Sequence, residues 1–243
     1  MAKPKQKIIL ALYELSGVFT RLYQQLGYKV IQVDKQLDGS DVRLLKKVDG
    51  NVVGIISHPP CTHFAGSGAR WWKDKTDEQL IDALSMVDAV FRMVTIYKPK
   101  FWFIENPVGR LTHYIGKPKY YFNPCDFAGY LKNPEDEAFT KKTCLWGEFN
   151  IPTKKPVKPK FVVLKDGKRM SKVHYDSFYL PAKERANIRS KTPLGFAYAF
   201  VLANPGTVSD STLNPTDLIF PSEKEFNKDY RVSPKSKFKL KRS

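Results

Sequence analysis

The segment Lys7-Ile8-Ile9-Leu10-Ala11-Leu12-Tyr13 is apolar throughout its interior, and the loop Glu14–Gly17 follows it. A run this short and this uniformly apolar predicts a strand that is buried on both faces. Residues 18–26 then carry a helical pattern, and residues 29–33 form a second apolar run. Strand, helix and strand in this order are typical of a parallel sheet with helices packed on its faces.

The same alternation continues further along the chain. An apolar run at 52–56 precedes a stretch over 77–97 whose apolar residues recur every three or four positions, which predicts a long amphipathic helix. Another strand is expected over 101–104. We therefore predict an α/β fold with a doubly wound, mostly parallel sheet and helices on both faces. Later elements are expected as strands near 120–122, 143–146 and 161–164, and as a helix over 182–203 that breaks at Pro193.

The pattern weakens between about residues 117 and 182, where Pro, Lys and aromatic residues are frequent. We expect a very small β-rich insertion there, inside a single domain that spans residues 1–205. Residues 206–243 have little periodicity and end in a basic stretch, which predicts a loosely attached basic C-terminal tail.

The chain of 243 residues has 41 Lys and Arg against 24 Asp and Glu, a formal net charge of +17. This excess of positive charge predicts an anionic partner, with nucleic acid as the first candidate. No apolar run is long enough to span a membrane. The cysteines, Cys61, Cys125 and Cys144, match neither a disulfide framework nor a zinc site. We therefore expect a cytoplasmic protein that binds no membrane and no metal.

Segments with reactive or polar side chains follow three of the predicted strands: Glu14–Gly17, Pro59–Cys61 and Glu105–Asn106. Ligands of doubly wound sheets bind at the carboxyl ends of the strands, so we expect these segments to line one cleft. A cysteine thiolate that faces a carboxylic acid suits addition to a polarised ring. Asp34, at the end of the second strand, is placed to bind ribose hydroxyls.

The motifs around these segments resemble a known family. Ser57-His58-Pro59-Pro60-Cys61-Thr62, Ser67-Gly68-Ala69-Arg70-Trp71 and Ile104-Glu105-Asn106-Pro107-Val108-Gly109 are similar to motifs of the cytosine carbon-5 DNA methyltransferases, in particular the small phage-type members. Thr140–Trp146 and Arg189–Ala197 resemble the later blocks of that branch. The resemblance covers roughly residues 8–203 in order.

The resemblance implies a class I, Rossmann-like methyltransferase fold that uses S-adenosylmethionine. Cys61 would attack carbon 6 of cytosine, Glu105 would hold or protonate ring nitrogen 3, and Asn106 would shape the loop that carries Cys61. Carbon 5 would then take the methyl group. On duplex DNA the target base has to leave the helix, so base flipping is expected.

The resemblance also implies a cofactor site and a DNA contact surface. The residues expected to bind the cofactor are Tyr13, Glu14, Ser16, Gly17, Asp34 at the ribose, Asp41 at the adenine amine, and Pro59. Leu15 stands where the family has its first glycine, and a branched side chain obstructs the close backbone approach that this glycine permits. The residues expected to contact DNA are Arg70, Lys141, Lys142 and Arg189, with Lys142 where larger relatives carry an arginine near the reacting base.

Two other functions remain open from the sequence. Leu15 favours a degenerate methyltransferase fold that binds nucleic acid without turnover, whereas the presence of Cys61, Glu105 and Asn106 favours an enzyme. The short insertion is compatible with an enzyme that methylates a free deoxycytidine nucleotide. The high positive charge favours DNA, because a single nucleotide needs few cations.

Overall fold

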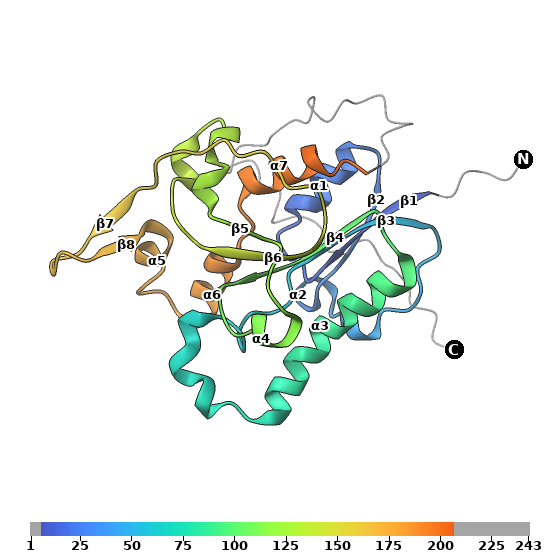
Figure 1. Cartoon of the computed structure of the whole chain (residues 1–243), viewed down its shortest axis with the longest axis horizontal. Helices are drawn as coiled ribbons and strands as arrows, with labels where there is room; N and C mark the ends of the chain where they lie inside the picture. Colours follow the sequence, from blue (N-terminus) through green and yellow to red (C-terminus); the bar gives the residue numbers. More distant parts are fainter. Residues whose placement is uncertain (1–5, 207–243) are drawn as a thin grey trace, which may run out of the picture.

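The computed structural model describes residues 6–206 (Figure 1). Of the tail expected over 206–243, only residue 206 belongs to the described residues. The central sheet has six strands in the order β2-β1-β3-β4-β6-β5. Their bounds are β1 Lys7–Leu12, β2 Lys29–Val33, β3 Asn51–Ser57, β4 Phe101–Pro107, β5 Tyr120–Phe122 and β6 Thr143–Glu148. Strands β1 to β4 are parallel, and β6 runs antiparallel to both β4 and β5. The expected mixed α/β fold with a mostly parallel sheet is confirmed.

Helices cover both faces of this sheet, as predicted. Helices α1 (Val18–Gln25) and α7 (Leu194–Ala203) pack on one face, and α3 (Asp77–Tyr97) packs on the other (Figure 1). The α1 and α7 side is mainly aromatic: Phe103 and Phe200 have ring centroids 4.8 Å apart. Burial of large aromatic rings of this kind contributes much of the free energy of folding.

The helix predicted over 182–203 is two helices, α6 (Ala182–Ser190) and α7, and the break falls at Pro193 as expected. The remaining helices are short, most of them single turns, and the sequence pattern did not predict them. They are the α-helices α2 Lys35–Asp38, α4 Thr112–Ile115 and α5 Lys172–Asp176, and the 3-10 helices η1 Val42–Leu44, η3 Pro124–Asp126, η4 Ala128–Tyr130 and η5 Pro134–Glu137, together with the longer η2 Gly66–Asp74. One turn gives too few residues for a hydrophobic period to be visible.

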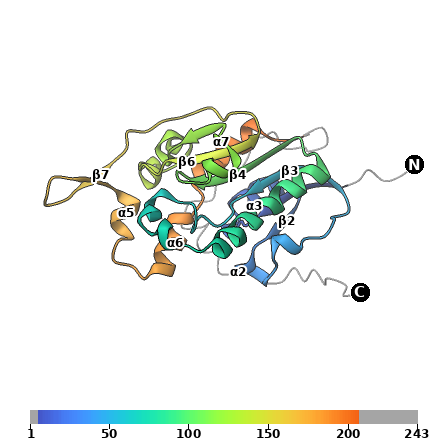
Figure 2. The same cartoon turned by 60° about the horizontal axis from the view of Figure 1, so that its bottom comes forward.

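The range expected as an insertion, about 117–182, divides into two parts. Its first part supplies β5 and β6, which extend the central sheet beyond β4. Its second part forms a separate hairpin of β7 (Phe161–Val163) and β8 (Arg169–Ser171), which projects from the body of the molecule (Figures 1 and 2). This hairpin, α5 and the short helices η3, η4 and η5 lie outside the sheet.

Within residues 6–206, no helix combines the length and the apolar character that a membrane-spanning helix needs.

Candidate functional site

The three polar segments that follow β1, β3 and β4 meet at one edge of the sheet. Leu12 at the end of β1 pairs with Ser57 at the end of β3, and Ser57 pairs with Ile104 of β4. The order of the strands reverses between β1 and β3, since β2 lies on one side of this pair and β4 on the other. Such a switch point opens a crevice outside the carboxyl ends of the strands, where ligands bind.

Asn106 ties the loop after β3 to β4. Its buried side chain donates a hydrogen bond of 2.8 Å from Nδ2 to the carbonyl oxygen of Pro59. Pro59 and Pro60 have no backbone N–H and fixed φ angles, so the turn before Cys61 has little freedom of its own. The contact therefore fixes where Cys61 stands relative to β4.

The loop that follows Cys61 is joined to the loop that follows β4. The backbone N–H of Gly66 donates to the carbonyl of Val108 (2.8 Å), and that of Arg110 donates to the carbonyl of Phe64 (2.8 Å). Gly109 lies in this junction because there is no room for a side chain: a Cβ would stand 1.9 Å from the carbonyl oxygen of Phe64. The glycine of the Asn-Pro-Val-Gly motif thus has a steric explanation.

The thiol of Cys61 and the carboxyl group of Glu105 lie within electrostatic range of each other. Burial, and secondarily Glu105, raises the pKa of the Cys61 thiol, and Lys141 acts in the opposite direction. Burial also raises the pKa of Glu105, again opposed by Lys141. The ammonium group of Lys141 therefore lies close to both groups and favours their charged forms.

Lys142, expected near the reacting base, has its Nζ 5.1 Å from the centroid of the Tyr121 ring. Its charge also acts on the buried thiol of Cys144 in β6, which lies within electrostatic range of Glu105 as well. Its contact with DNA stays a prediction, and Lys141 is the lysine whose charge acts on Cys61 and Glu105.

Many of the buried polar atoms without a hydrogen-bond partner among the described residues lie at the ends of β3 and β4 and in the loops that follow these strands. They include both ring nitrogens of His58, Oγ of Ser57, Nδ1 of His63, Oδ1 of Asn106 and Nη2 of Arg110. Most buried polar groups in proteins are hydrogen-bonded, so such a concentration marks a site that forms contacts with something else. His58 was not singled out from the sequence as a site residue, although it directly precedes Pro59-Pro60-Cys61. Burial, and secondarily Lys141, lowers the pKa of His58 to about 3, so its ring is neutral at physiological pH.

The loop after β1 has an unusual backbone. Tyr13 has a φ of 55°, which side-chain-bearing residues rarely adopt, and Gly17 at the start of α1 has a φ of 67°. The hydroxyl of Tyr13 donates to the carbonyl of Met86 in α3 (3.0 Å), which holds its ring in place. Strained backbone persists only where the surrounding structure enforces it, and it is common at functional sites.

Glu14 is buried, and its carboxylate has partners of its own. It accepts hydrogen bonds from the hydroxyl groups of Ser16 (2.5 Å) and Thr20 (3.0 Å) and from the backbone N–H of Val18 (3.0 Å). Both hydroxyls and the helix N-terminus stabilise a negative charge. Burial nevertheless raises its pKa to about 7, because removal from water disfavours the charged form more than these donors favour it.

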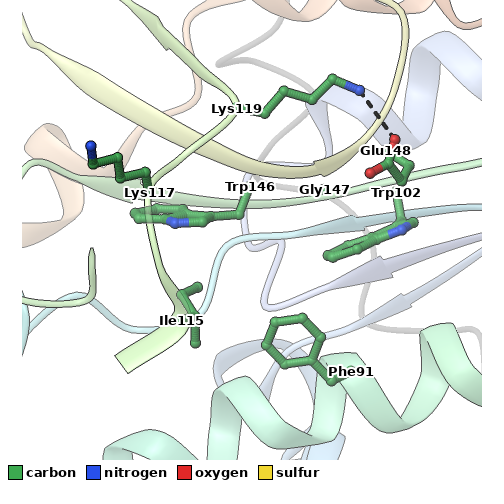
Figure 3. A pocket seen from close by; sticks show the side chains of 8 residues that line it. All are labelled: Phe91, Trp102, Ile115, Lys117, Lys119, Trp146, Gly147 and Glu148. Atoms are coloured by element: carbon green, nitrogen blue, oxygen red, sulfur yellow. Dashed lines mark hydrogen bonds and ion pairs between the residues drawn. The ribbon is translucent and has the colours of Figure 1, made fainter. Parts of the chain in front are cut away.

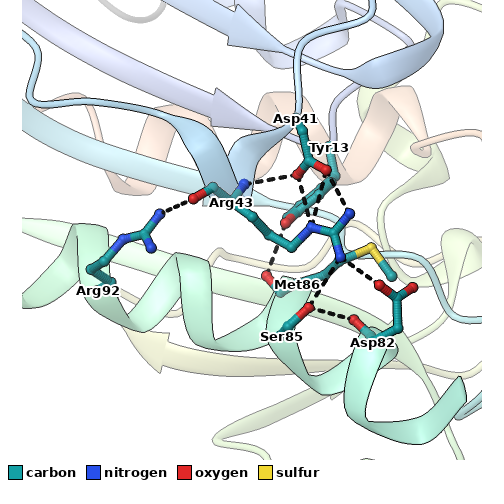
Figure 4. A network of polar contacts seen from close by, with 7 residues as sticks. All are labelled: Tyr13, Asp41, Arg43, Asp82, Ser85, Met86 and Arg92. Atoms are coloured by element: carbon teal, nitrogen blue, oxygen red, sulfur yellow. Dashed lines mark hydrogen bonds and ion pairs between the residues drawn. The ribbon is translucent and has the colours of Figure 1, made fainter. Parts of the chain in front are cut away.

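The two aspartates expected at the cofactor each begin a short helix. The carboxylate of Asp34 accepts from the backbone N–H of Gln36 (2.8 Å) at the end of β2. Asp41 accepts from Arg43, with an ion-pair distance of 2.6 Å, and Arg43 also contacts Asp82 of α3 (Figure 4). Hydrogen bonding to Arg43 lowers the pKa of Asp41 and keeps it charged.

The other residues expected to contact DNA have different environments. Arg70 lies on η2, and its guanidinium stands 5.0 Å from the ring of the exposed Trp71. Arg189 of α6 is engaged within the chain: its Nε donates to the hydroxyl of Ser177 (2.9 Å) and its Nη2 to the carbonyl of His174 (3.4 Å). Its guanidinium therefore orders the segment before α6.

A separate cavity of about 340 Å³ lies on the α3 side of β4 and β6 (Figure 3). Trp102, Trp146 and Phe91 form its aromatic walls, and Lys119 at its rim pairs with Glu148 (3.2 Å). The full lining is Phe91, Trp102, Ile115, Lys117, Lys119, Trp146, Gly147 and Glu148. None of the residues discussed above lines it. In the described part of the chain, no three His, Cys, Asp or Glu residues gather so that they could hold a metal ion.

No family model and no curated protein matches this chain. Among solved structures, it resembles a crystal structure described as a candidate DNA modification methyltransferase encoded within a prophage, from E. coli, at 17% sequence identity and a TM-score of 0.40. The match covers 73% of this chain and 56% of that chain, so the protein spans little more than half the length of this relative.

The raised pKa of Glu14 predicts a pH-dependent stability. Between its ordinary pKa of 4.5 and the folded value of about 7, the folded protein holds more protons than the unfolded chain. The contribution is therefore complete below about pH 4.5 and is lost as the pH rises through about 7. Urea denaturation should show the free energy of unfolding of the wild type falling, relative to Glu14→Gln, by roughly 3 kcal/mol between about pH 5 and pH 8. The exposed Glu148→Gln variant should parallel the wild type, and a parallel profile for Glu14→Gln would contradict the assignment.

Gly109→Ala should disturb the junction of the two loops. The added Cβ overlaps the carbonyl of Phe64, so the free energy of unfolding in urea should fall by roughly 1–3 kcal/mol. Gly68→Ala is the matched control: nothing lies within 4 Å of its Cβ position, and its effect should stay within about 0.5 kcal/mol. Equal stability of the two variants would show that the loops are not in close contact.

Proposed function

We propose that the protein is a class I methyltransferase that transfers a methyl group from S-adenosylmethionine to carbon 5 of cytosine in DNA, through a covalent adduct on Cys61. One observation carries the proposal. The Cys61 thiol lies within electrostatic range of the Glu105 carboxyl group, the Lys141 ammonium group acts on both, and Asn106 fixes the Cys61 loop to β4. A cysteine opposite a carboxylic acid is the arrangement that nucleophilic addition to a cytosine ring requires.

Cys61 would act as the nucleophile. Its thiolate would form a bond to carbon 6, which moves an electron pair of the ring toward carbon 5 and nitrogen 3. Burial disfavours the thiolate, so the Lys141 ammonium group has a defined role: it stabilises the negative sulfur before attack. When the proton at carbon 5 has left, the sulfur–carbon bond breaks and Cys61 returns to its thiolate form.

Glu105 would supply the acid. Burial raises its pKa, so its carboxyl group holds a proton more readily than an exposed glutamate does. A protonated Glu105 can donate to ring nitrogen 3 and stabilise the charge that the attack by Cys61 pushes onto the ring. The same proton returns to Glu105 when Cys61 is eliminated.

The loops after β1 and β2 fit an S-adenosylmethionine site in their chemistry. The cofactor, when bound, supplies the electrophilic methyl group. The left-handed Gly17 opens the backbone at the N-terminus of α1, and the loop residues Tyr13, Glu14 and Ser16 would face the methionine portion. Asp34 would hold the ribose.

Two further residues would complete this pocket. Asp41 would bind the adenine amine, while Arg43 keeps its carboxylate charged and in place. Pro59, which Asn106 holds, would border the pocket on the side of the nucleophile. Leu15, half-buried in the loop after β1, is the feature that favours binding without turnover.

DNA is the substrate class that the charge favours. A net charge of +17 is far more than recognition of one free nucleotide requires. The Cys61 side chain is half-buried, so a target base in duplex DNA would have to flip out to reach it. Arg70, Lys141 and Lys142 would contact the strand, whereas Arg189 would act by ordering the segment before α6.

Covalent trapping tests the proposal directly. Duplex DNA that carries 5-fluorocytosine cannot lose a proton from carbon 5, so elimination of Cys61 is blocked and the adduct accumulates when S-adenosylmethionine is present. The wild type should form an adduct that survives a denaturing gel, and Cys61→Ser should form none. Cys125→Ala is the control, because Cys125 lies outside the cleft, and it should keep the adduct.

An adduct that persists in Cys61→Ser would overturn the assignment of the nucleophile. If the wild type binds the DNA but never forms an adduct, the binding protein without turnover is the better account.

A further inference from the structure

The loop between α5 and α6, residues 177–181, presents aromatic side chains to solvent. Tyr179 is 88% exposed and Phe178 is 52% exposed, and their rings are 5.1 Å apart in an edge-to-face arrangement. We call these two residues the aromatic pair. Two large aromatic side chains side by side on a surface are costly to keep in water and typically mark a contact site.

The exposure of the aromatic pair is imposed by a rigid frame beneath it. Ser177 is fully buried; its hydroxyl donates to the carbonyl of Val173 (2.6 Å) and accepts from Nε of Arg189 (2.9 Å). On the other side of the loop, Nη2 of Arg185 donates to the carbonyl of Leu180 (3.1 Å). These contacts hold both ends of a short loop, and the rings between them are exposed.

The same segment is attached to the cleft. The hydroxyl of Ser171, at the end of β8, donates to the carbonyl of Thr140 (2.7 Å), the residue before Lys141. The charge of Lys141 acts on His174 of α5 as well as on Cys61. The segment that carries the aromatic pair therefore begins at the rim of the candidate site.

Basic residues precede the aromatic pair in the chain. The turn of the hairpin and the strand after it carry Lys165, Lys168 and Arg169, and α5 begins with Lys172. Lys168 pairs with Asp166 and Lys172 with Asp176, both on the exposed surface. Figures 1 and 2 both show α6 beside η2. On η2, the guanidinium of Arg70 stands over the ring of Trp71, and Trp71 is 54% exposed. Exposed aromatic rings among cations are the arrangement by which proteins hold unpaired bases.

We propose that Phe178 and Tyr179 form a stacking platform that holds an unpaired base of the DNA strand next to the nucleotide in the Cys61 cleft. The inference rests on the proposed function in taking DNA as the partner and in placing the target nucleotide at Cys61. The chemistry is base stacking, which needs a flat π face and tolerates any base, together with charge attraction to the phosphates. A platform of this kind favours a strand that is single or locally opened.

Binding of fluorescent oligonucleotides tests the platform without any methyl transfer. The probe is a single strand of about 12 nucleotides, beside the same strand with abasic sites and the matched duplex, at one low salt concentration. The variants are Tyr179→Phe, which keeps the aromatic face, and Tyr179→Leu, which keeps apolar bulk without it. Leu44→Ala, an exposed apolar residue on η1, is the remote control.

The platform predicts that Tyr179→Leu binds the single strand about tenfold more weakly, whereas Tyr179→Phe and Leu44→Ala bind like the wild type. It also predicts that the wild type binds the abasic strand more weakly and that Tyr179→Leu loses nothing further on that strand. Equal affinity of Tyr179→Leu and the wild type for the single strand would overturn the proposal. An equal loss on the normal and abasic strands would do so too, because it would show that the aromatic face does not contact bases.

These results are independent of the trapping experiment. If Cys61 forms no adduct and Tyr179→Leu still loses base-dependent affinity, the proposed reaction fails and the platform stands. If the adduct forms and the Tyr179 variants all bind alike, the reaction stands and the platform fails.

Discussion

One buried hydrogen bond, from Nδ2 of Asn106 to the carbonyl oxygen of Pro59, joins the two halves of the candidate site. Strand β3 ends before two prolines, and β4 ends in a third, so neither strand can continue the sheet past this point. The Pro59 carbonyl would otherwise lack a partner, and a buried polar group without a partner costs about 1–3 kcal/mol. The side chain of Asn106 satisfies it and at the same time fixes the position of the loop that carries Cys61 relative to β4, which carries Glu105.

The charges at the cleft oppose its burial. Removal from water disfavours both the thiolate of Cys61 and the carboxylate of Glu105, and these two groups also repel each other when both are charged. Lys141 is the cation that offsets part of this cost. The neutral, unpartnered His58 and the strained Tyr13 lie at the same edge of the sheet. Buried charges, buried polar atoms without a hydrogen-bond partner and strained backbone therefore occur together at this edge of the sheet, beside a core of packed aromatic rings. Such costly features typically cluster at functional sites.

Elements with a strong local signal were predictable from the sequence. The helix over 77–97 has a clear apolar face, and Thr76 and Gln79 form a capping box at its start, so pattern and local chemistry agree. The ends of β3 and β4, near Cys61 and Glu105, were also predictable from the sequence, because the apolar run of each strand stops at a polar residue or a proline. Short helices such as α5 carry no such signal. Which charges act on Cys61 and Glu105 depends on how the chain enters β6, and only the folded structure shows that Lys141 is one of them. The partners of Arg189, likewise, come from a segment that no periodicity connects to it.

Nucleoside mass spectrometry shows whether the protein methylates cytosine in DNA, as we propose. DNA incubated with the protein and S-adenosylmethionine should contain 5-methyldeoxycytidine after digestion, and DNA incubated with Cys61→Ser should contain none. A parallel reaction with deoxycytidine monophosphate should give no methylated product. Methylation of the monophosphate alone, or no methylated base in DNA that the folded protein demonstrably binds, would contradict the account.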